Sequence, residues 1–146
     1  MTIKIEDEGW EGLANTLNHA IPEMARAALR DAMENASTVV VKAARDSAPV
    51  AKEQKKGGEE PGYLRENIDY TISVHTSSEG YSITSKIEPV HGLDPSTWYG
   101  FLQEFGTFCQ QGKHWLARAW ETVGREPEEI FIERLTQTCE DLDKGD

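Results

Sequence analysis

The chain has 146 residues, a formal net charge of −11 and a mean hydropathy of −0.59. This length is enough for one domain with a real hydrophobic core, so we expect residues 1–146 to form a single domain. The charge argues against a protein that grips duplex DNA by its phosphates, because such binding needs clustered lysine and arginine. It argues equally against docking on an anionic membrane surface.

Cysteine content and targeting signals indicate the compartment. Cys109 and Cys139 are too few for a disulfide framework, and neither belongs to a C-x-x-C motif. Reduced thiols in a cytosolic compartment fit them best. The N-terminal sequence MTIKIEDEG is acidic where a signal peptide is basic. No run approaches the roughly 18 apolar residues of a membrane span. We therefore expect a soluble intracellular protein.

Helical periodicity dominates the first third of the chain, where apolar residues recur in steps of three or four. Pro22 falls inside this pattern, and proline is favoured in the first turn of a helix but not in its interior. We therefore predict a short helix near residues 9–20 and a long one over 22–46, ended by Ala48-Pro49. The stripe expected to face one way is Trp10, Leu13, Leu17, Ile21, Met24, Ala28, Ala32, Ala36, Val39 and Ala43.

The middle of the chain predicts a loop and a hairpin. Residues 50–62 are charged, glycine-rich and poor in apolar side chains, which is typical of a mobile loop. Residues 63–90 alternate polar and apolar positions around the linker SSEG, a hairpin signal. The residues expected to share one face are Ile68, Tyr70, Ile72 and Val74 in the first strand, and Tyr81, Ile83, Ser85 and Ile87 in the second. Because a hairpin alone is marginal, we expect the long helix to cover it.

Residues 96–142 read as mainly helical. A short helix over 98–105 would stop at Gly106, a second would cover 114–123, and a third would start at Pro127. Residues 121–146 hold nine acids against three bases, a net of −6, which we interpret as a solvated helix face with a frayed acidic tail. The order helix, hairpin, helices predicts an α+β fold.

Residue types found in active sites gather in YGFLQEFGTFCQQGKHWLARAW, residues 99–120. Cys109 and His114 are the candidate nucleophile and base, but no motif supplies the third, orienting group. The four histidines lack the spacing of a zinc site. Trp98, Trp115 and Trp120 could stack on single-stranded bases, but they lack the basic neighbours of such a site, which favours core packing. We therefore expect no catalytic residue, metal or cofactor.

Glu104 is an acid among apolar residues, and a carboxylate in that position must turn outward or be paired, because burying it alone is costly. Arg65 and Arg118 are the candidate partners. We predict that an ion pair with one of them locks the short helix against the domain.

Three stretches, taken in order, resemble the neck or tail-completion proteins of long-tailed bacteriophages and prophages, often labelled minor tail components. A long helix ends in AARDSAPV. The turn PGYLRENI, residues 61–68, is similar to the family's Thr-Gly-x-Leu-Arg-x-Ser-Ile block. YGFLQEFGT, residues 99–107, and the following HWLARAWE look like Tyr-Ala-x-x-x-Glu-Phe-Gly-Thr and Pro-Phe-Leu-Arg-Pro-Ala. The chain departs from the pattern at Pro61, at His114-Trp115 and in a longer loop before residue 61.

The resemblance implies a non-enzymatic virion protein of the head–tail junction. Such a protein is a homo-oligomer, often a six-membered ring around the DNA channel, and it contacts the connector or head-closure protein and the tail-tube or tail-terminator protein. DNA would pass without specific binding, and an acidic 121–146 segment facing the channel would let it slide. The fold and assembly role carries over onto Gly62, Leu64, Arg65, Glu104, Phe105, Gly106, Thr107, Leu116 and Arg118.

Three alternatives stay open at this point. A tail terminator, which caps the tail tube, belongs to the same class of protein. A small cytosolic hydrolase using Cys109 would lose activity in a Cys109→Ser variant. An acidic module that mimics nucleic acid would bind a basic partner tightly and in a salt-sensitive way.

Overall fold

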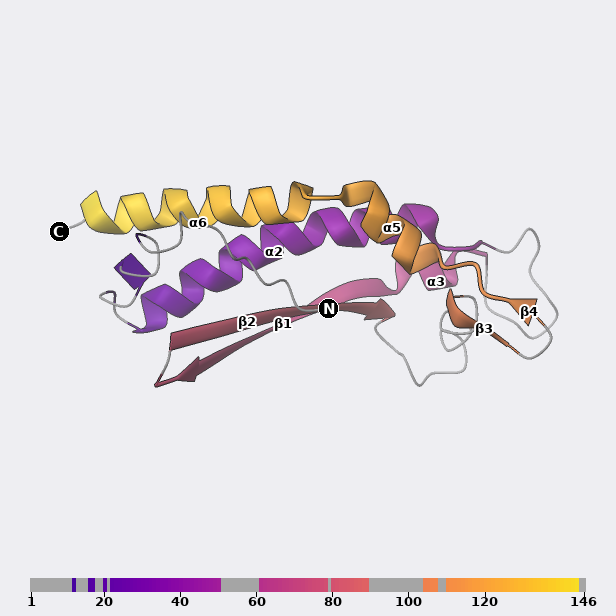
Figure 1. The fold of residues 1–146 in the computed structure, drawn as a ribbon, viewed down its shortest axis with the longest axis horizontal. Helices are drawn as coiled ribbons and strands as arrows, with labels where there is room; N and C mark the ends of the chain where they lie inside the picture. The colour runs from indigo at the N-terminus through magenta and orange to yellow at the C-terminus, as the bar shows by residue number, and fades with distance from the viewer. Residues whose placement is uncertain are drawn as a thin grey trace. The chain divides into compact units, whose positions relative to one another are not determined.

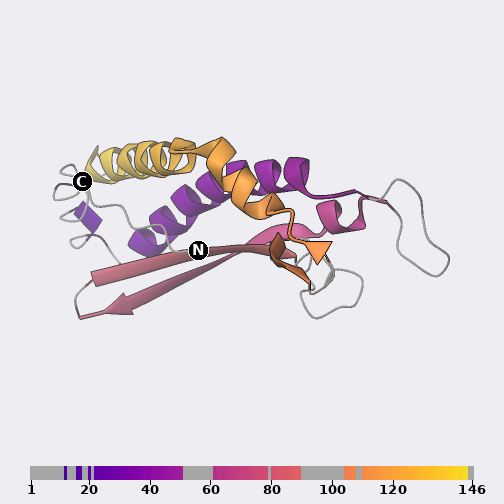
Figure 2. The ribbon, with the colours of Figure 1, turned by 45° about the vertical axis from the view of Figure 1, so that its right-hand side comes forward.

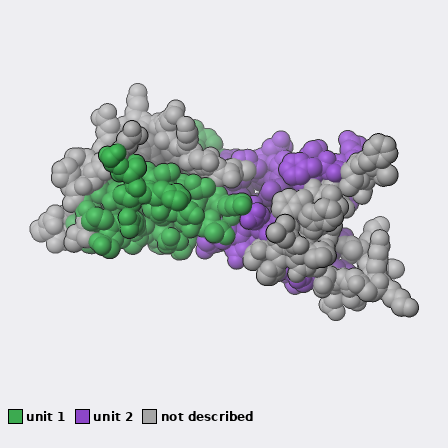
Figure 3. Space-filling model, turned by 90° about the horizontal axis from the view of Figure 1, so that it is seen from below, with its two compact units in different colours: residues 1–38, 71–86, 125–146 green, residues 39–70, 87–124 purple. Residues whose placement is uncertain are grey.

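The computed structural model describes residues 12, 16–17, 20, 22–50, 61–78, 80–89, 104–107 and 110–144. A long helix, a two-stranded sheet and C-terminal helices follow one another along the chain (Figure 1), so the predicted α+β class is confirmed. The chain forms two compact units (Figure 3). Unit 1 comprises residues 1–38, 71–86 and 125–146, and unit 2 comprises residues 39–70 and 87–124. That residues 1–146 make one domain stays a prediction.

Helix α2 spans Pro22–Ser47 and confirms the predicted long helix. Its first turn holds Pro22 and Glu23 and its last turn holds Arg45, which matches the preferences of helix ends for proline, acids and bases. The short helix predicted near residues 9–20 and the loop predicted over 50–62 lie mostly outside the described residues.

The predicted stripe of α2 is partly wrong. Ala28, Ala32 and Ala36 are buried as expected, but Met24 is 44% exposed, and Val40, rather than Val39, is buried. The helix buries a face two rows wide, because in unit 1 it packs against both the sheet and a second helix. A stripe drawn through a single row of apolar residues therefore misplaces the centre of the buried face of α2. The buried positions are Ala25, Ala28, Leu29, Ala32, Met33, Ala36, Ser37, Val40, Val41 and Ala44.

Strands β1 (Ile68–Ser77) and β2 (Gly80–Pro89) form the predicted hairpin. Burial alternates along β1 with Ile68, Tyr70, Ile72 and Val74 on the covered side, and Ser85 is the buried centre of β2, so the predicted faces are confirmed. The hairpin is shorter than the predicted 63–90, because Tyr63–Glu66 form a single helical turn, α3, before it.

In unit 1 the covered face of the hairpin packs against α2. Ile72, Val74, Tyr81 and Ile83 lie on a core that includes Ala28, Ala32 and Met33. Two arginines of α2 also reach β1. Arg26 donates to the Thr76 hydroxyl at 2.9 and 3.1 Å, and Arg30 donates to the Ile72 carbonyl oxygen at 3.5 Å.

A buried pair of hydroxyls joins α2 to β2 in unit 1. Ser37 Oγ and Ser85 Oγ are 2.6 Å apart, and the two residues are 2% and 4% exposed. Replacing Ser37 alone with alanine leaves the Ser85 hydroxyl buried without its partner, which will cost about 1–2 kcal/mol of unfolding free energy. Replacing both serines with alanine will cost less than either single change, because no polar group is then stranded. Urea denaturation of the three variants tests this order, and additive losses would contradict it.

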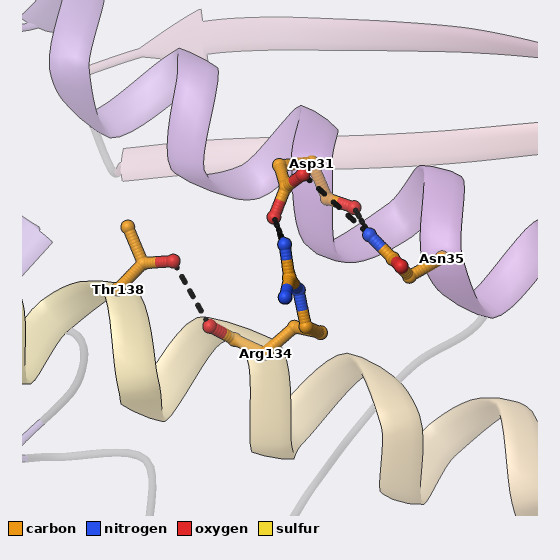
Figure 4. Close-up of polar contacts among 4 residues, drawn as sticks. All are labelled: Asp31, Asn35, Arg134 and Thr138. Atoms are coloured by element: carbon orange, nitrogen blue, oxygen red, sulfur yellow. Dashed lines mark hydrogen bonds and ion pairs between the residues drawn. The ribbon is translucent and has the colours of Figure 1, made fainter.

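Helix α6 spans Glu126–Lys144, close to the predicted start at Pro127. The expected frayed acidic tail is helical as far as Lys144, because Phe131, Leu135 and Cys139 recur every four residues and are buried in the core of unit 1. Arg134 reaches from α6 to Asp31 of α2 at 3.0 Å, and Asn35 donates to the same aspartate (Figure 4).

Unit 2 has its own core around a tryptophan. Helix α5 spans Trp115–Val123, and Trp115 is 2% exposed, which confirms core packing for this tryptophan. Trp115 belongs to one buried cluster with Leu64 of α3, Ile68 of β1 and Ala44 of α2. The ribbon of α5 crosses beside the last turns of α2 (Figure 2). In the same unit Arg45 donates to the Ile68 carbonyl oxygen at 2.8 and 3.1 Å.

Candidate functional site

The Glu104 side chain is buried and caps helix α5. It is 7% exposed, and its two oxygens accept hydrogen bonds from the backbone N–H groups of Leu116 at 2.7 Å and Ala117 at 3.2 Å. These N–H groups lie in the first turn of the helix, where no intrahelical acceptor exists. The carboxylate also sits at the positive end of the helix dipole. Glu104 therefore supplies the N-terminal cap of α5 from twelve residues upstream.

Helix α5 is capped from a distance because the side chain at its own N-cap position, His114, makes no capping hydrogen bond. His114 occupies the N-cap position with φ of 48°, in the left-handed region, and its side chain makes no capping hydrogen bond. Its backbone N–H donates instead to the Glu104 carbonyl oxygen at 3.2 Å. Glu104 is thus held to the start of α5 through both its main chain and its side chain.

The left-handed backbone of His114 predicts that glycine at this position stabilises the protein. A non-glycine residue in this region is strained by about 1–2 kcal/mol, and the His114 side chain is exposed. His114→Gly should therefore raise the free energy of unfolding by about 0.5–1 kcal/mol, after subtraction of the entropy that glycine adds to the unfolded chain. Thermal and urea denaturation measure the change, and a loss of stability would show that the histidine side chain does more than occupy the turn.

The predicted ion pair of Glu104 is wrong. The Arg118 guanidinium donates to the Lys113 carbonyl oxygen, and Arg65 donates to the Ala48 carbonyl oxygen at 3.5 Å. Helix N–H groups satisfy the buried carboxylate without bringing a second charge out of water, which avoids the larger desolvation cost of a buried ion pair. Each arginine instead supports a helix end: Arg118 at the segment entering α5, and Arg65 just after the last residue of α2.

A very short β-pairing closes the loop between Glu104 and α5. Strand β3 (Gly106–Thr107) pairs antiparallel with β4 (Gln110–Gln111), with Gly106 opposite Gln111 and Thr107 opposite Gln110. Gly106 has φ of 84°, in agreement with its predicted role as the stop after Glu104 and Phe105, which are helical. The pairing itself was not predicted. We call residues 104–107 and 110–118 the Glu104 junction.

Gly112 is the residue of the Glu104 junction that sequence reasoning missed. A Cβ at this position would lie 2.5 Å from the Glu104 carbonyl oxygen, 2.6 Å from the Phe105 carbonyl carbon and 2.8 Å from the Gly106 nitrogen. All three are backbone atoms, so no side chain can rotate away to make room. The available signal is a glycine two residues before the predicted helix start at His114, which on its own indicates an ordinary loop residue.

At the centre of the Glu104 junction a charged side chain is buried and the neighbouring aromatic side chain is exposed. Glu104 is buried, whereas its neighbour Phe105 is 74% exposed. The carboxylate faces inward because it caps the helix, and this orientation turns the next side chain toward solvent. Among the described residues Phe105 is the most exposed of the large hydrophobic side chains.

The remaining residues singled out by the resemblance lie around α3, at the start of the hairpin. Gly62 precedes α3 with φ of 93°, a backbone conformation that side chains rarely adopt, and Leu64 is fully buried. Leu64 and Trp115 share the core of unit 2, and Leu116 packs against it. The resemblance therefore selects residues in two places: the turn around α3, and the Glu104 junction, which contains Phe105, Gly106, Thr107, Leu116 and Arg118. Leu64 from the first and Leu116 from the second lie at the core of unit 2.

The hydrogen bonds of the Glu104 carboxylate are structural. Both of its oxygens accept backbone N–H groups, so the carboxylate caps helix α5. Cys109 lies outside the described residues, so its pairing with His114 is untested. The described residues contain no group of three or more His, Cys, Asp or Glu that could hold a metal ion. None of the described helices is long and apolar enough to cross a membrane.

Comparison with protein-family models, with curated proteins and with solved structures finds no match for this chain.

Proposed function

We propose that this chain is a non-enzymatic structural protein of the head–tail junction of a long-tailed bacteriophage or prophage. It acts as a subunit of a ring around the DNA channel. Its partners are other copies of itself, the connector or head-closure protein on one side, and the tail-tube or tail-terminator protein on the other. DNA passes through without specific binding, in keeping with the net charge of −11.

One observation carries the proposal. In the Glu104 junction, which holds most of the resemblance, the buried carboxylate caps α5 and the main chain of β3 pairs with that of β4. The junction's most exposed large hydrophobic side chain among the described residues is Phe105, at 74%. Burying a reactive carboxylate and presenting a phenylalanine suits a protein that binds other proteins, because aromatic side chains are enriched at protein interfaces.

A genetic deletion tests the function. Removing the coding gene from the phage or prophage genome should leave heads and tails that assemble separately and do not join, as seen by electron microscopy. Expression of the chain in trans should restore infectious particles. Normal joined virions from the deletion would contradict the proposal.

A mass measurement tests the ring. Native mass spectrometry and light scattering of the purified chain, from micromolar to millimolar concentration, should show a closed multiple, with six as the expected number. A persistent monomer would rule out spontaneous ring formation. The ring would then have to form on the connector, and the chain should bind that protein directly.

A further inference from the structure

Three residues of the Glu104 junction in unit 2 are exposed and are aromatic or cationic: Phe105, Lys113 and Arg118. Phe105 is brought to Gly112, the neighbour of Lys113, by a main-chain contact so close that a Cβ at Gly112 would lie 2.6 Å from the Phe105 carbonyl carbon. The Arg118 guanidinium bonds to the Lys113 carbonyl oxygen. The main chain thus brings three exposed residues, one aromatic and two cationic, to the Glu104 junction, and we call these three residues the Phe105 patch.

The Phe105 patch stands on a fixed backbone. Glu104, the preceding residue, is tied to α5 by two side-chain bonds and one main-chain bond, and Gly106, the following residue, pairs with Gln111. A side chain presented on ordered backbone loses little further freedom on binding, so it is suited to anchor a partner. Aromatic and arginine side chains are also the residues that dominate binding energy at interfaces.

Unit 1 carries a surface of the opposite sign. Four glutamates of α6 are exposed and recur at helical spacing on the side opposite Phe131 and Leu135, which are buried. The half-buried Ile130 and Ile132 flank them and offer aliphatic surface to an aromatic ring. The two arginines nearest in sequence bond elsewhere, Arg125 to Glu128 and Arg134 to Asp31. We call this surface the acidic ridge: Glu126, Glu129, Glu133 and Glu140.

We propose that the Phe105 patch of one copy of this chain binds the acidic ridge of a second copy. This inference rests on the proposed function, since it identifies the contact between ring subunits. The two surfaces are complementary in charge, whereas a patch-to-patch or ridge-to-ridge contact would bring like charges together. Charge is also divided between the units: unit 1 holds 16 acids and 7 bases, a net of −9, and unit 2 holds 10 acids and 8 bases, a net of −2.

A contact between two different surfaces is head-to-tail, and such contacts generate rings when the rotation between neighbours closes. Every copy then uses its Phe105 patch toward one neighbour and its acidic ridge toward the other. In this arrangement the acidic ridge is covered by the adjacent subunit. It therefore does not line the DNA channel, where the sequence alone had suggested placing it.

Two half-blocked variants test the contact. The first, Phe105→Ser with Lys113→Glu, removes the patch and keeps the ridge. The second, Glu129→Lys with Glu133→Lys, removes the ridge and keeps the patch. All four side chains are exposed, so both variants should melt like the wild type. Glu23→Lys with Glu66→Lys, at two exposed positions outside both surfaces, controls for the +4 change in net charge of the second variant.

Sedimentation velocity and native mass spectrometry give the readout. Each half-blocked variant alone should self-associate at least about tenfold more weakly than the wild type. Their mixture should form a 1:1 complex that weakens with salt, and the control variant should behave like the wild type. Self-association of the ridge variant alone would indicate patch-to-patch contact and overturn the proposal. A monomeric mixture, or a wild type that is monomeric at millimolar concentration, would also overturn it.

The outcomes separate this inference from the proposed function. A wild type that forms closed rings while the mixture stays monomeric would leave the ring in place and refute this contact. A 1:1 complex from a chain whose gene deletion leaves virions intact would establish the contact and refute the role in head–tail joining.

Discussion

Gly112→Ala will lower the free energy of unfolding by about 3 kcal/mol, since overpacking at a site that cannot relax costs roughly this much or more. The added methyl group would lie 2.5–2.8 Å from backbone atoms of Glu104, Phe105 and Gly106, so either the loop or the start of α5 must move. Moving either one also weakens the hydrogen bond from the His114 N–H to the Glu104 carbonyl oxygen. Urea denaturation and differential scanning calorimetry measure the loss, which corresponds to a fall of about 6–12 °C in Tm for a chain of this size.

Gly12→Ala is the matched control, because nothing lies within 4 Å of a Cβ at that exposed position. Alanine should be neutral or slightly stabilising there, since Gly12 is helical and glycine is a poor helix former. If Gly112→Ala were as well tolerated as Gly12→Ala, the close approach of the loop to Glu104 would not exist in solution.

Glu104→Ala will destabilise the protein by about 2–3 kcal/mol, because it removes a helix cap and two hydrogen bonds to a charged acceptor at once. Glu104→Gln keeps one oxygen acceptor but loses the charge at the helix N-terminus, so its cost should be smaller, about 1–2 kcal/mol. Amide hydrogen exchange gives a local readout, since the N–H groups of Leu116 and Ala117 should lose protection in both variants.

Glu121→Gln, an exposed change on α5 itself, should stay within about 0.5 kcal/mol of the wild type and controls for the general effect of losing an acid. Wild-type stability in both Glu104 variants, with unchanged exchange at Leu116, would refute the cap. Arg118→Met tests the abandoned ion pair. Arg118→Met should not reproduce the loss of unfolding free energy caused by Glu104→Gln. If it did, and if the double variant lost less than the sum of the two, an ion pair between Glu104 and Arg118 would have to be accepted.

Periodicity predicted the elements whose residues interact with near neighbours in sequence or repeat a regular pattern. The long helix was expected over 22–46 and spans Pro22–Ser47. The inward face of the hairpin was also predicted correctly, because strand alternation leaves only two choices of face and the apolar residues select one. The last helix was expected from Pro127, but the burial of Cys139 was not, because a single cysteine adds little to an apolar pattern.

The sequence indicates which residues form the Glu104 junction, but it does not predict how they contact one another. Its residue types were identified, yet the partner of Glu104 was sought among arginines, because a sequence displays charges and does not display helix N–H groups twelve residues away. The β3–β4 pairing has two residues a side, too few for a period to appear. The centre of the buried face of α2 depends on what packs against both sides of that helix, which no local pattern records.

The arginines of α2 that reach β1 have a consequence for how the chain behaves when crowded. Ile68 and Ile72 lie an even number of residues apart, so their carbonyl groups point to the same edge of the strand. Arg45 and Arg30 already donate to those two oxygens. A foreign strand that sought hydrogen bonds from these two carbonyl groups would have to displace a guanidinium group at each of them. The same residues that fasten a two-stranded sheet to its helix thus occupy two acceptors of β1 that an aggregating strand would otherwise use.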